Sequence, residues 1–427
     1  MASGLFALFY TAAGVVFPLW ATRDVGLRND QWATLVSFRY AGVAIGMVLL
    51  GPLSNRLGAA RTGAAAIMGL ALMMLGMSSS QPLVVWLSFP LFGPLMSTGL
   101  LNVTALIQQV SARRQGLANS VCSSVVAAVG IVAPTAATAL AVRVGGYPGL
   151  FVVFAAVLVV VAGVVWSYPG QSRPAPLRGW GREVRAALHS HRALLTNGPL
   201  MLVLHLSSIG MYAMVGVTLF AAIRFTKELG LSDQRFGLLA SIAAALTLGI
   251  TALAALFLDR WPLRVVASAS LGLAGASAIT LGLTDSTKLA AAAWLLYIPV
   301  IALAALPVTM WIARVTAPEA HPGAYAMAKL WAAVYLIATP WLAGRLERWM
   351  GIKPVFVTGG AIAVLAAITV SRLPEPPRPG GSETEEGVRH RQVDRATRRD
   401  HSQPFARAAA TRWERNRRRR GRTRRQS

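Results

Sequence analysis

The sequence has 427 residues, of which 55% are hydrophobic and only 13% are charged, and its mean hydropathy is +0.54. A soluble domain normally carries about 25% charged residues, so this composition excludes an ordinary soluble protein and indicates a membrane protein. The formal net charge of +25 is concentrated at one end, because 17 of the 41 Lys and Arg residues are arginines between Arg372 and Arg425.

The first apolar run begins within a few residues of Met1. No basic segment precedes it and no small-residue cleavage site follows it, so we expect a retained span rather than a signal peptide. The single cysteine, Cys122, cannot form an internal disulfide and lies in no metal-binding or redox motif.

Apolar runs of membrane-spanning length recur along the chain. A bilayer core about 30 Å thick needs about 20 apolar residues in a helix, and a helix satisfies its own backbone in lipid. The sequence predicts twelve spans, six on each side of a basic stretch. They are roughly Gly4–Thr22, Trp32–Leu53, Thr62–Met77, Pro82–Val110, Leu117–Val142, Tyr147–Tyr168, Pro199–Ile223, Phe236–Leu258, Val265–Leu283, Leu289–Val315, Ala324–Leu342 and Pro354–Val370.

These runs predict an all-α integral membrane protein with twelve transmembrane helices in two pseudo-symmetric six-helix bundles. We expect an N-terminal half over residues 1–168, a cytoplasmic basic linker over 169–198, a C-terminal half over 199–373 and a tail over 374–427. The Arg-rich tail lacks apolar periodicity, which predicts disorder. Counting the bases of linker and tail, the positive-inside rule places both termini in the cytoplasm, and we predict a multi-pass plasma-membrane protein.

The two halves align with each other at a nearly constant offset of about 202 to 207 residues. "YTAAGVVF" from Tyr10 corresponds to "YAMVGVTLF" from Tyr212, and "GLRNDQ" from Gly26 to "GLSDQ" from Gly230. Further matches follow in the same order, which indicates an internal repeat. They are Gly46 with Gly249, "NRLGAAR" with "DRWPLR", Gly116 with Gly323, and Pro134 with Pro340.

On these features the chain resembles the major facilitator superfamily, which has twelve helices in two halves and a signature loop between helices 2 and 3. That signature runs Gly, three residues, Asp, Arg or Lys, one residue, Gly, then basic residues. In "GPLSNRLGAAR", Gly51, Arg56, Gly58 and Arg61 match, whereas Asn55 stands where the family usually has Asp.

The second half repeats this loop as "FLDRWPLR", in which Asp259, Arg260 and Arg264 match and Pro262 replaces the glycine. The resemblance implies that both loops are conformational latches, which hold the halves together on the cytoplasmic side in the outward-facing state. Glycine permits a tight turn, and arginines can bond helix-end carbonyls or a facing carboxylate. The alternative is that these are only positive-inside loops.

A second family motif lies in helix 5, where exporters that exchange substrate for protons carry a glycine-rich Gly-Pro run. Here "GIVAPTAA" keeps Gly130 and Pro134, but Ala133 and Ala137 occupy glycine positions. This degraded match favours export weakly. The helix-4 arginine common in proton-coupled exporters is missing.

Ionisable residues inside the predicted spans are few. No Asp or Glu falls within the twelve runs. The ionisable residues that lie well inside a run are Arg39, His205 and Lys329. Charges in lipid are costly, so these residues are candidate substrate-binding residues. The alternative is snorkelling, because each lies only about 10 Å from a membrane face. Tyr10, Tyr212 and Asn102 are further candidates for substrate contacts, or for hydrogen bonds between helices.

No enzyme motif is present, and we expect neither cofactor nor metal: no phosphate-binding loop ends in Lys-Ser or Lys-Thr, and the only close histidine pair lacks other ligands. The sequence therefore predicts a secondary transporter, most simply an efflux permease for amphipathic or drug-like compounds. The alternatives are a transporter of a small organic or inorganic anion, and a non-transporting membrane receptor or lipid-interacting scaffold. Whether a proton is coupled is left open.

The end of the tail, "RWERNRRRRGRTRR", places nine arginines between Arg412 and Arg425. Such a run is expected to adsorb to anionic lipid, and a nucleic-acid partner is disfavoured because a membrane-tethered protein meets lipid first. The alternative is an extension without a specific role. We expect truncation after Pro374 to leave folding and transport nearly intact.

Overall fold

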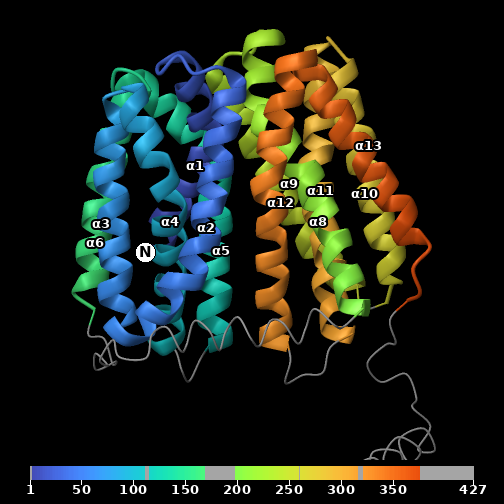
Figure 1. Cartoon of the computed structure of the whole chain (residues 1–427), viewed down its shortest axis with the longest axis horizontal. Helices are drawn as coiled ribbons and strands as arrows, with labels where there is room; N and C mark the ends of the chain where they lie inside the picture. Colours follow the sequence, from blue (N-terminus) through green and yellow to red (C-terminus); the bar gives the residue numbers. More distant parts are fainter. Residues whose placement is uncertain (1, 111–114, 169–197, 259, 316–320, 376–427) are drawn as a thin grey trace, which may run out of the picture. The chain divides into compact units, whose positions relative to one another are not determined.

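The computed structural model describes residues 2–110, 115–168, 198–258, 260–315 and 321–375 (Figure 1). These residues form twelve α-helices and one short π-helix, and they contain no strand, so the predicted all-α architecture is confirmed. Within them, eight helices are long and apolar enough to cross a membrane. The elements are α1 (Ala2–Arg23), α2 (Asn29–Leu57), α3 (Ala59–Ser78), α4 (Pro82–Val110), α5 (Gln115–Arg143), α6 (Tyr147–Trp166), α8 (Gly198–Ile223), η1 (Arg224–Glu228), α9 (Asp233–Phe257), α10 (Leu263–Leu283), α11 (Thr287–Val315), α12 (His321–Met350) and α13 (Ile352–Ser371).

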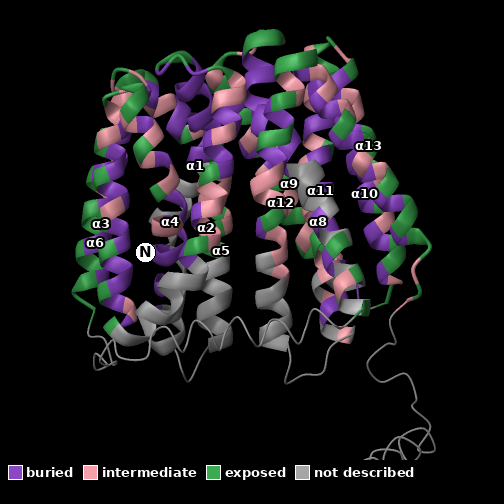
Figure 2. Cartoon of the chain, viewed as in Figure 1, coloured by how far each residue is buried: buried purple, intermediate pink, exposed green. Residues whose placement is uncertain are grey.

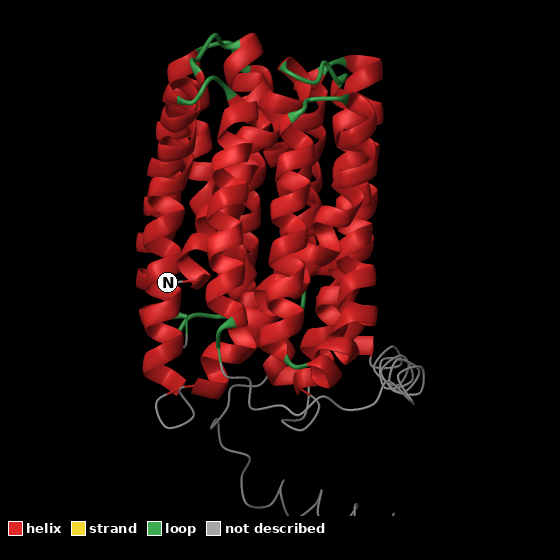
Figure 3. Ribbon diagram, turned by 90° about the vertical axis from the view of Figure 1, so that its left-hand side faces the viewer, coloured by secondary structure: helices red, strands yellow, loops and turns green. Residues whose placement is uncertain are grey.

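The packing of the helices repeats between the halves. Helix α3 packs on α6 in the first half, and α10 packs on α13 in the second. Between the halves, α2 packs on α12 and α5 packs on α9. Exchanging the halves turns one of these two seams into the other, because α2 corresponds to α9 and α5 to α12 in the repeat. The helices lie side by side along their length, and the described turns lie at the two ends of the bundle (Figure 3).

Buried residues occur along the helices of both halves (Figure 2), and many of them are aromatic. In the first half, Phe17 stacks edge-on against Phe92 at a centroid distance of 5.4 Å, and Trp20 against Phe151 at 4.8 Å. In the second half, Phe225 stacks on Phe236 at 5.4 Å. Such pairs contribute packing energy beyond area burial, so each half has its own core.

The structure corrects the predicted loop after the second span. Helix α2 continues through Gly51, Asn55 and Arg56 to Leu57, and Gly58 alone separates it from α3. Gly58 has a φ of +90°, a conformation that side-chain-bearing residues rarely adopt. The signature is therefore mostly the last turns of a helix, because hydrogen bonding ends only where glycine permits the reversal.

Helix α12 is also longer than predicted and ends at Met350 rather than Leu342. Its added turns are polar on one side, so the apolar run stopped before the helix did. Gly351, with a φ of +83°, ends it and donates its N–H to the carbonyl of Glu347 at 2.7 Å. We call the end of the bundle at which α1, α3, α5 and α12 finish the outer end, following the predicted orientation.

Candidate functional site

A pocket of about 110 Å³ lies among α1, α2 and α8 and so is shared by the two halves. Its lining is aromatic and aliphatic apart from one charged residue, Arg39, and the hydroxyls of Tyr40 and Thr218. A mainly apolar lining with a few polar groups is typical of a small-molecule site. The lining residues are Ala13, Gly14, Phe17, Pro18, Trp32, Val36, Arg39, Tyr40, Val215, Thr218 and Leu219.

Arg39 lies half-buried against aromatic rings. Its Cζ is 4.8 Å from the ring centroid of Phe92 and 5.5 Å from that of Tyr40, and Nη2 is 4.0 Å from the Sδ of Met96. Cation–π contacts of this kind stabilise a guanidinium by about 0.5–2 kcal/mol. They orient the guanidinium plane, so its N–H donors point along its edge, the geometry that binds carboxylates.

Helix α4 holds Arg39 in place through a close helix contact. A Cβ atom at Gly93 would lie 1.9 Å from the backbone oxygen of Arg39, and one at Gly42 would lie 2.4 Å from the oxygen of Pro90. Neither position can accept a side chain unless the helices separate. Glycines therefore set the approach of α2 to α4, and with it the position of the only charge in the pocket lining.

His205 is exposed on α8 and contacts two aromatic residues of α12. Its Nδ1 is 2.9 Å from the hydroxyl of Tyr335 and 3.4 Å from the Nε1 of Trp331. The indole N–H can only donate, so Nδ1 is the acceptor in this contact and Nε2 carries the hydrogen. This cluster does not line the Arg39 pocket. Sequence analysis did not single out Trp331 or Tyr335, although their spacing of four residues puts them on one helix face.

The other predicted substrate contacts lie elsewhere or outside the described side chains. Asn102 is 3% exposed, donates to the carbonyl of Thr98 in its own helix at 2.8 Å, and packs where Gly63 of α3 approaches. It does not line the pocket. Tyr10, Tyr212 and Lys329 lie on α1, α8 and α12, and their side chains are outside the described set.

Four of the predicted latch residues are described and lie at the inner end: Gly58, Arg61, Arg260 and Arg264. The three arginines are exposed. Gly51, Asn55 and Arg56 lie in the last turns of α2, but the side chains of Asn55 and Arg56 are outside the described set, as is the whole of Asp259.

Glu375, which sequence analysis missed, caps the first turn of α10. Its carboxylate accepts the backbone N–H of Leu263 at 2.6 Å and that of Arg264 at 3.1 Å, and lies 3.8 Å from Nη1 of the buried Arg314. An acid at a helix N-terminus satisfies otherwise unpaired N–H groups and opposes the helix dipole. It is the first acidic residue after the last apolar run, which could have indicated it.

The predicted helix-5 motif lies in the seam between α5 and α9. A Cβ at Gly237 of α9 would lie 2.9 Å from the backbone oxygen of Pro134, so the two helices meet closely there. One residue on, the hydroxyls of Thr135 and Ser241 are 2.7 Å apart across the seam. Gly130 lies one turn earlier in α5. The motif thus lies at a contact between the halves.

Two groups of polar contacts join the halves at the outer end. In the first, Nη1 of Arg23 donates to both carboxylate oxygens of Asp233 at 2.7 Å, and the hydroxyl of Tyr147 donates to the Oδ2 of Asp233 at 2.6 Å. Arg23 and Tyr147 belong to the first half and Asp233 to the second. Charge-assisted bonds of this kind are the strong ones, so α9 is tied to α1 and α6.

The second group joins α2 to α12. Asn29 donates to Glu347 at 2.7 Å, and Nη1 of Arg348 lies 3.6 Å from the Oδ2 of Asp30. A Cβ at Gly344 would lie 2.6 Å from the Cβ of Ala33, so the two backbones almost touch. We call the two groups together the outer closure. Asp30 and Asp233 occupy the same place in the repeated "GLRNDQ" and "GLSDQ" turns, which sequence analysis treated only as markers of the repeat.

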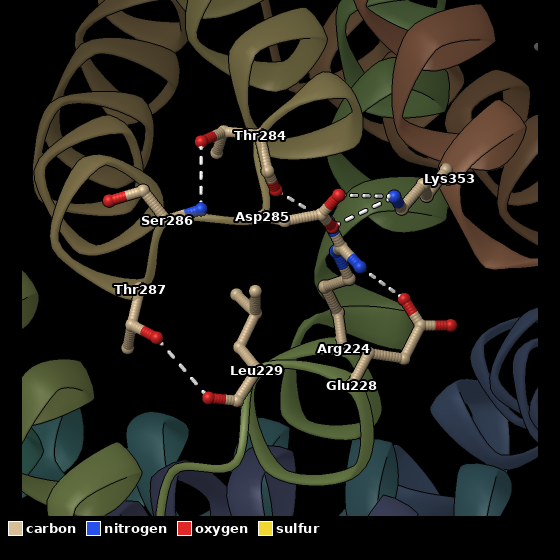
Figure 4. Close-up of polar contacts among 8 residues, drawn as sticks. All are labelled: Arg224, Glu228, Leu229, Thr284, Asp285, Ser286, Thr287 and Lys353. Carbon is tan, nitrogen blue, oxygen red and sulfur yellow. Dashed lines mark hydrogen bonds and ion pairs between the residues drawn. The ribbon is translucent and has the colours of Figure 1, made fainter.

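The turns of the second half are tied together by Arg224, which is 1% exposed (Figure 4). It forms an ion pair with Glu228, and Nη2 donates to the carbonyl of Thr284 at 2.6 Å and to Asp285 at 3.2 Å. Lys353 also pairs with Asp285, at 2.8 Å. The hydrogen bonds from Lys353 and Arg224 hold the pKa of the Asp285 carboxyl below its ordinary value. This cluster fixes η1 relative to α10 and α13.

A pocket to which two pseudo-symmetric helical halves contribute, with polar side chains tying the halves together at one end, is typical of a membrane transporter of the two-domain type. The model of the Major Facilitator Superfamily matches residues 1–311 and 204–421, and the chain belongs to this superfamily. It is thus a multi-pass membrane transporter, and the resemblance seen in the sequence is confirmed. No curated protein matches the sequence.

Solved transporters share the fold at low identity. The nucleoside transporter NupG has 12% identity over 86% of this chain and 96% of its own, with a TM-score of 0.72. The inward-open xylose transporter XylE from E. coli has 15% identity over 91% and 97%, with a TM-score of 0.68. The human organic anion transporter MFSD10 (TETRAN) has 14% identity over 86% and 97%, with a TM-score of 0.57. At these identities the likeness shows the fold alone.

Proposed function

We propose that the protein is an efflux permease for small amphipathic organic compounds and works by alternating access. The observation that carries this proposal is the pocket among α1, α2 and α8, because aromatic residues and a single arginine line it and both halves contribute to it. Rings such as Phe17, Trp32 and Tyr40 would take the apolar part of a substrate. Arg39 would bind its hydrogen-bond acceptor.

A second candidate substrate class, a small organic anion, is favoured by Arg39 itself. Stacking on Phe92 and Tyr40 leaves the edge of the guanidinium as its donor surface, and no other residue of the lining is charged. A carboxylate or phosphate would pair with this edge in two parallel hydrogen bonds. The two candidates differ in whether a full negative charge is required.

The outer closure supports alternating access. It joins the halves at one end of the bundle, whereas the predicted latch residues Arg61, Arg260 and Arg264 lie at the other. In our proposal the closure breaks when the pocket opens outward and the inner latches form. We further propose that both termini lie in the cytoplasm and that the protein resides in the plasma membrane.

Transport assays in proteoliposomes test the proposal. Flux of the lipophilic cation ethidium and of the anion carboxyfluorescein would be followed with the purified full-length chain, using protein-free liposomes as reference. Flux of either compound supports a transporter of amphipathic compounds, and flux of carboxyfluorescein alone supports the anion candidate. Absence of flux for a panel of amphipathic cations, neutral compounds and anions would favour a receptor or scaffold.

Arg39 variants then separate binding from scaffolding. We expect Arg39→Ala to raise the KM for an anionic substrate about 10- to 100-fold, because a charge-assisted hydrogen bond is worth about 1.5–3 kcal/mol. Arg39→Lys should recover part of this, since it keeps the charge but loses the planar donor edge. Arg143→Ala is the matched control, because it removes an exposed arginine away from both the pocket and the latches. Wild-type KM in Arg39→Ala would mean that the side chain only snorkels.

A further inference from the structure

A wide hollow of about 400 Å³ lies on the outer part of α12, separate from the transport pocket. It is lined by Trp341, Leu342, Arg345, Leu346 and Trp349. The residues are spaced three or four apart, so they form one continuous face of the helix. Four of the five are apolar, and the fifth carries a positive charge.

Large apolar side chains on this face are exposed. Trp349 is 77% exposed, Trp341 45% and Leu342 41%. The sequence predicts that α12 spans the membrane, and exposed aromatic side chains at the end of a spanning helix lie at the level of the lipid head groups. We therefore expect the hollow to lie where acyl chains meet head groups.

Arg345 lies at the border of this apolar face and a polar one. Its Cζ is 5.4 Å from the ring centroid of Trp341, which holds the guanidinium against the indole. Both residues also line a second pocket of about 80 Å³, together with Asp30 and Arg348. The side chain thus adjoins an apolar groove on one side and a polar recess on the other.

The two neighbouring arginines, Arg345 and Arg348, differ in their contacts with carboxylates. Arg348 lies 3.6 Å from the carboxylate of Asp30. Among the residues that the structure describes, no carboxylate lies within 4.0 Å of the Arg345 guanidinium. A cation at the head-group level beside an apolar groove, with its neighbour already paired, is complementary to an anionic head group attached to an acyl chain.

We propose that this groove binds one anionic phospholipid, whose phosphate pairs with Arg345 and whose acyl chain lies along Trp341, Leu342 and Trp349. The proposal does not depend on which substrate the protein transports. Its occupant would lie beside the seam between α2 and α12, next to the outer closure.

Native mass spectrometry of the full-length chain tests this site. The protein in detergent would be mixed with equal amounts of phosphatidylglycerol and phosphatidylcholine that carry the same acyl chains. We expect Arg345→Gln to lower the ratio of retained phosphatidylglycerol to phosphatidylcholine about fivefold. This is the change in affinity for anionic lipid that the loss of one base near the membrane surface produces. Arg345→Lys should keep most of the preference, because it keeps the charge.

Arg143→Gln is the matched control, since it neutralises another exposed arginine at the outer end. Both variants keep the Arg-rich tail and therefore have the same net charge. An equal fall in Arg345→Gln and Arg143→Gln would overturn the proposal, because the preference would then follow net charge. Loss of the bound lipid on adding glycerol phosphate would also overturn it, because the site would then bind a soluble phosphate rather than a lipid. Trp349→Ala should weaken retention of both lipids alike, and an unchanged retention would show that the groove holds no acyl chain.

Discussion

Removing Arg23 is expected to open the outer end of the pocket. The guanidinium contacts both oxygens of Asp233 at 2.7 Å, and the two side chains are 36% and 23% exposed. A fully buried charge-assisted bond is worth about 1.5–3 kcal/mol, and water screens a partly exposed one. We therefore assign the contact about 1–2 kcal/mol. If it exists only in the closed state, its loss shifts the equilibrium about 5- to 30-fold.

Thiol labelling of a pocket residue measures this shift. Thr218 lines the pocket, so Thr218→Cys in a Cys122→Ser background would be labelled with a membrane-impermeant reagent added to each face in turn. We expect Arg23→Ala to speed labelling from the outer face about 5- to 30-fold and to slow it from the inner face. Tyr147→Phe, which removes one hydrogen bond at 2.6 Å, should have a smaller effect in the same direction.

A charge exchange distinguishes a direct pair from a general loss of structure. Arg23→Asp combined with Asp233→Arg should restore slow outer labelling, whereas either single change should speed it. Arg143→Ala removes a base at the same end without touching the closure and should leave labelling unchanged. The reasoning is refuted if Arg23→Ala labels like the parent, or if the exchange labels as fast as the single variants.

Four further changes test individual contacts. Asp285→Asn should lower the apparent Tm at neutral pH, because the contacts with Lys353 and Arg224 that lower the pKa of Asp285 stabilise the fold only while the carboxyl is ionised. The difference should vanish as the pH falls through the depressed pKa of the folded carboxyl. Asp24→Asn should instead raise Tm at neutral pH, because burial raises the pKa of Asp24 and the ionised carboxylate therefore destabilises the folded state. The gain should disappear below the ordinary carboxyl pKa, where the parent carboxyl is protonated in both states. Equal Tm values for the parent and each variant at all pH values would contradict both predictions. Gly93→Ala should lower stability by about 1–3 kcal/mol or more in thermal unfolding, because its Cβ would meet a backbone oxygen at 1.9 Å, while Gly163→Ala, which meets nothing within 4 Å, should not. The contacts of Glu375 revise the expectation that truncation after Pro374 leaves folding nearly intact: it should cost about 1–2 kcal/mol relative to truncation after Glu375, because only the first removes the cap of α10. Equal Tm values would show that the cap is dispensable.

For the part of the chain that the structure describes, the number and order of the α-helices could be predicted from the sequence, whereas several of their ends could not. Length and hydropathy indicate a span because the bilayer fixes both. Helix ends depend on local backbone geometry. Gly58 and Gly351 end their helices with a positive φ, but the sequence does not distinguish such a glycine from one inside a helix, where φ is negative. For this reason the signature "GPLSNRLG" was predicted as a loop although α2 runs through it.

Individual site residues were predictable only where charge alone marked them. Arg39 stands out because a charge inside an apolar run is costly, and the structure places it in the lining of a pocket. Arg224 follows the predicted span Pro199–Ile223 and was not predicted as a site residue, because nothing in the sequence shows that Glu228, Thr284 and Asp285 surround it. Contacts between residues some 60 positions apart are set by tertiary packing, which a pattern of single residues does not carry.

The repeat explains why the outer closure has two parts and why they differ. Gly26 and Gly230 have φ values of +73° and +70°, so the same turn delivers Asp30 and Asp233 to the start of α2 and α9. Each of these helices forms a seam with the opposite half, so a duplicated acid necessarily faces the other half twice. Asp233 meets Arg23 across the seam at 2.7 Å, whereas Asp30 lies 3.0 Å from Arg28 of its own half and 3.6 Å from Arg348. Asp30 is thus divided between two bases and makes the longer ion pair between the halves, and the hydrogen bond from Asn29 to Glu347 at 2.7 Å adds a second contact on its side.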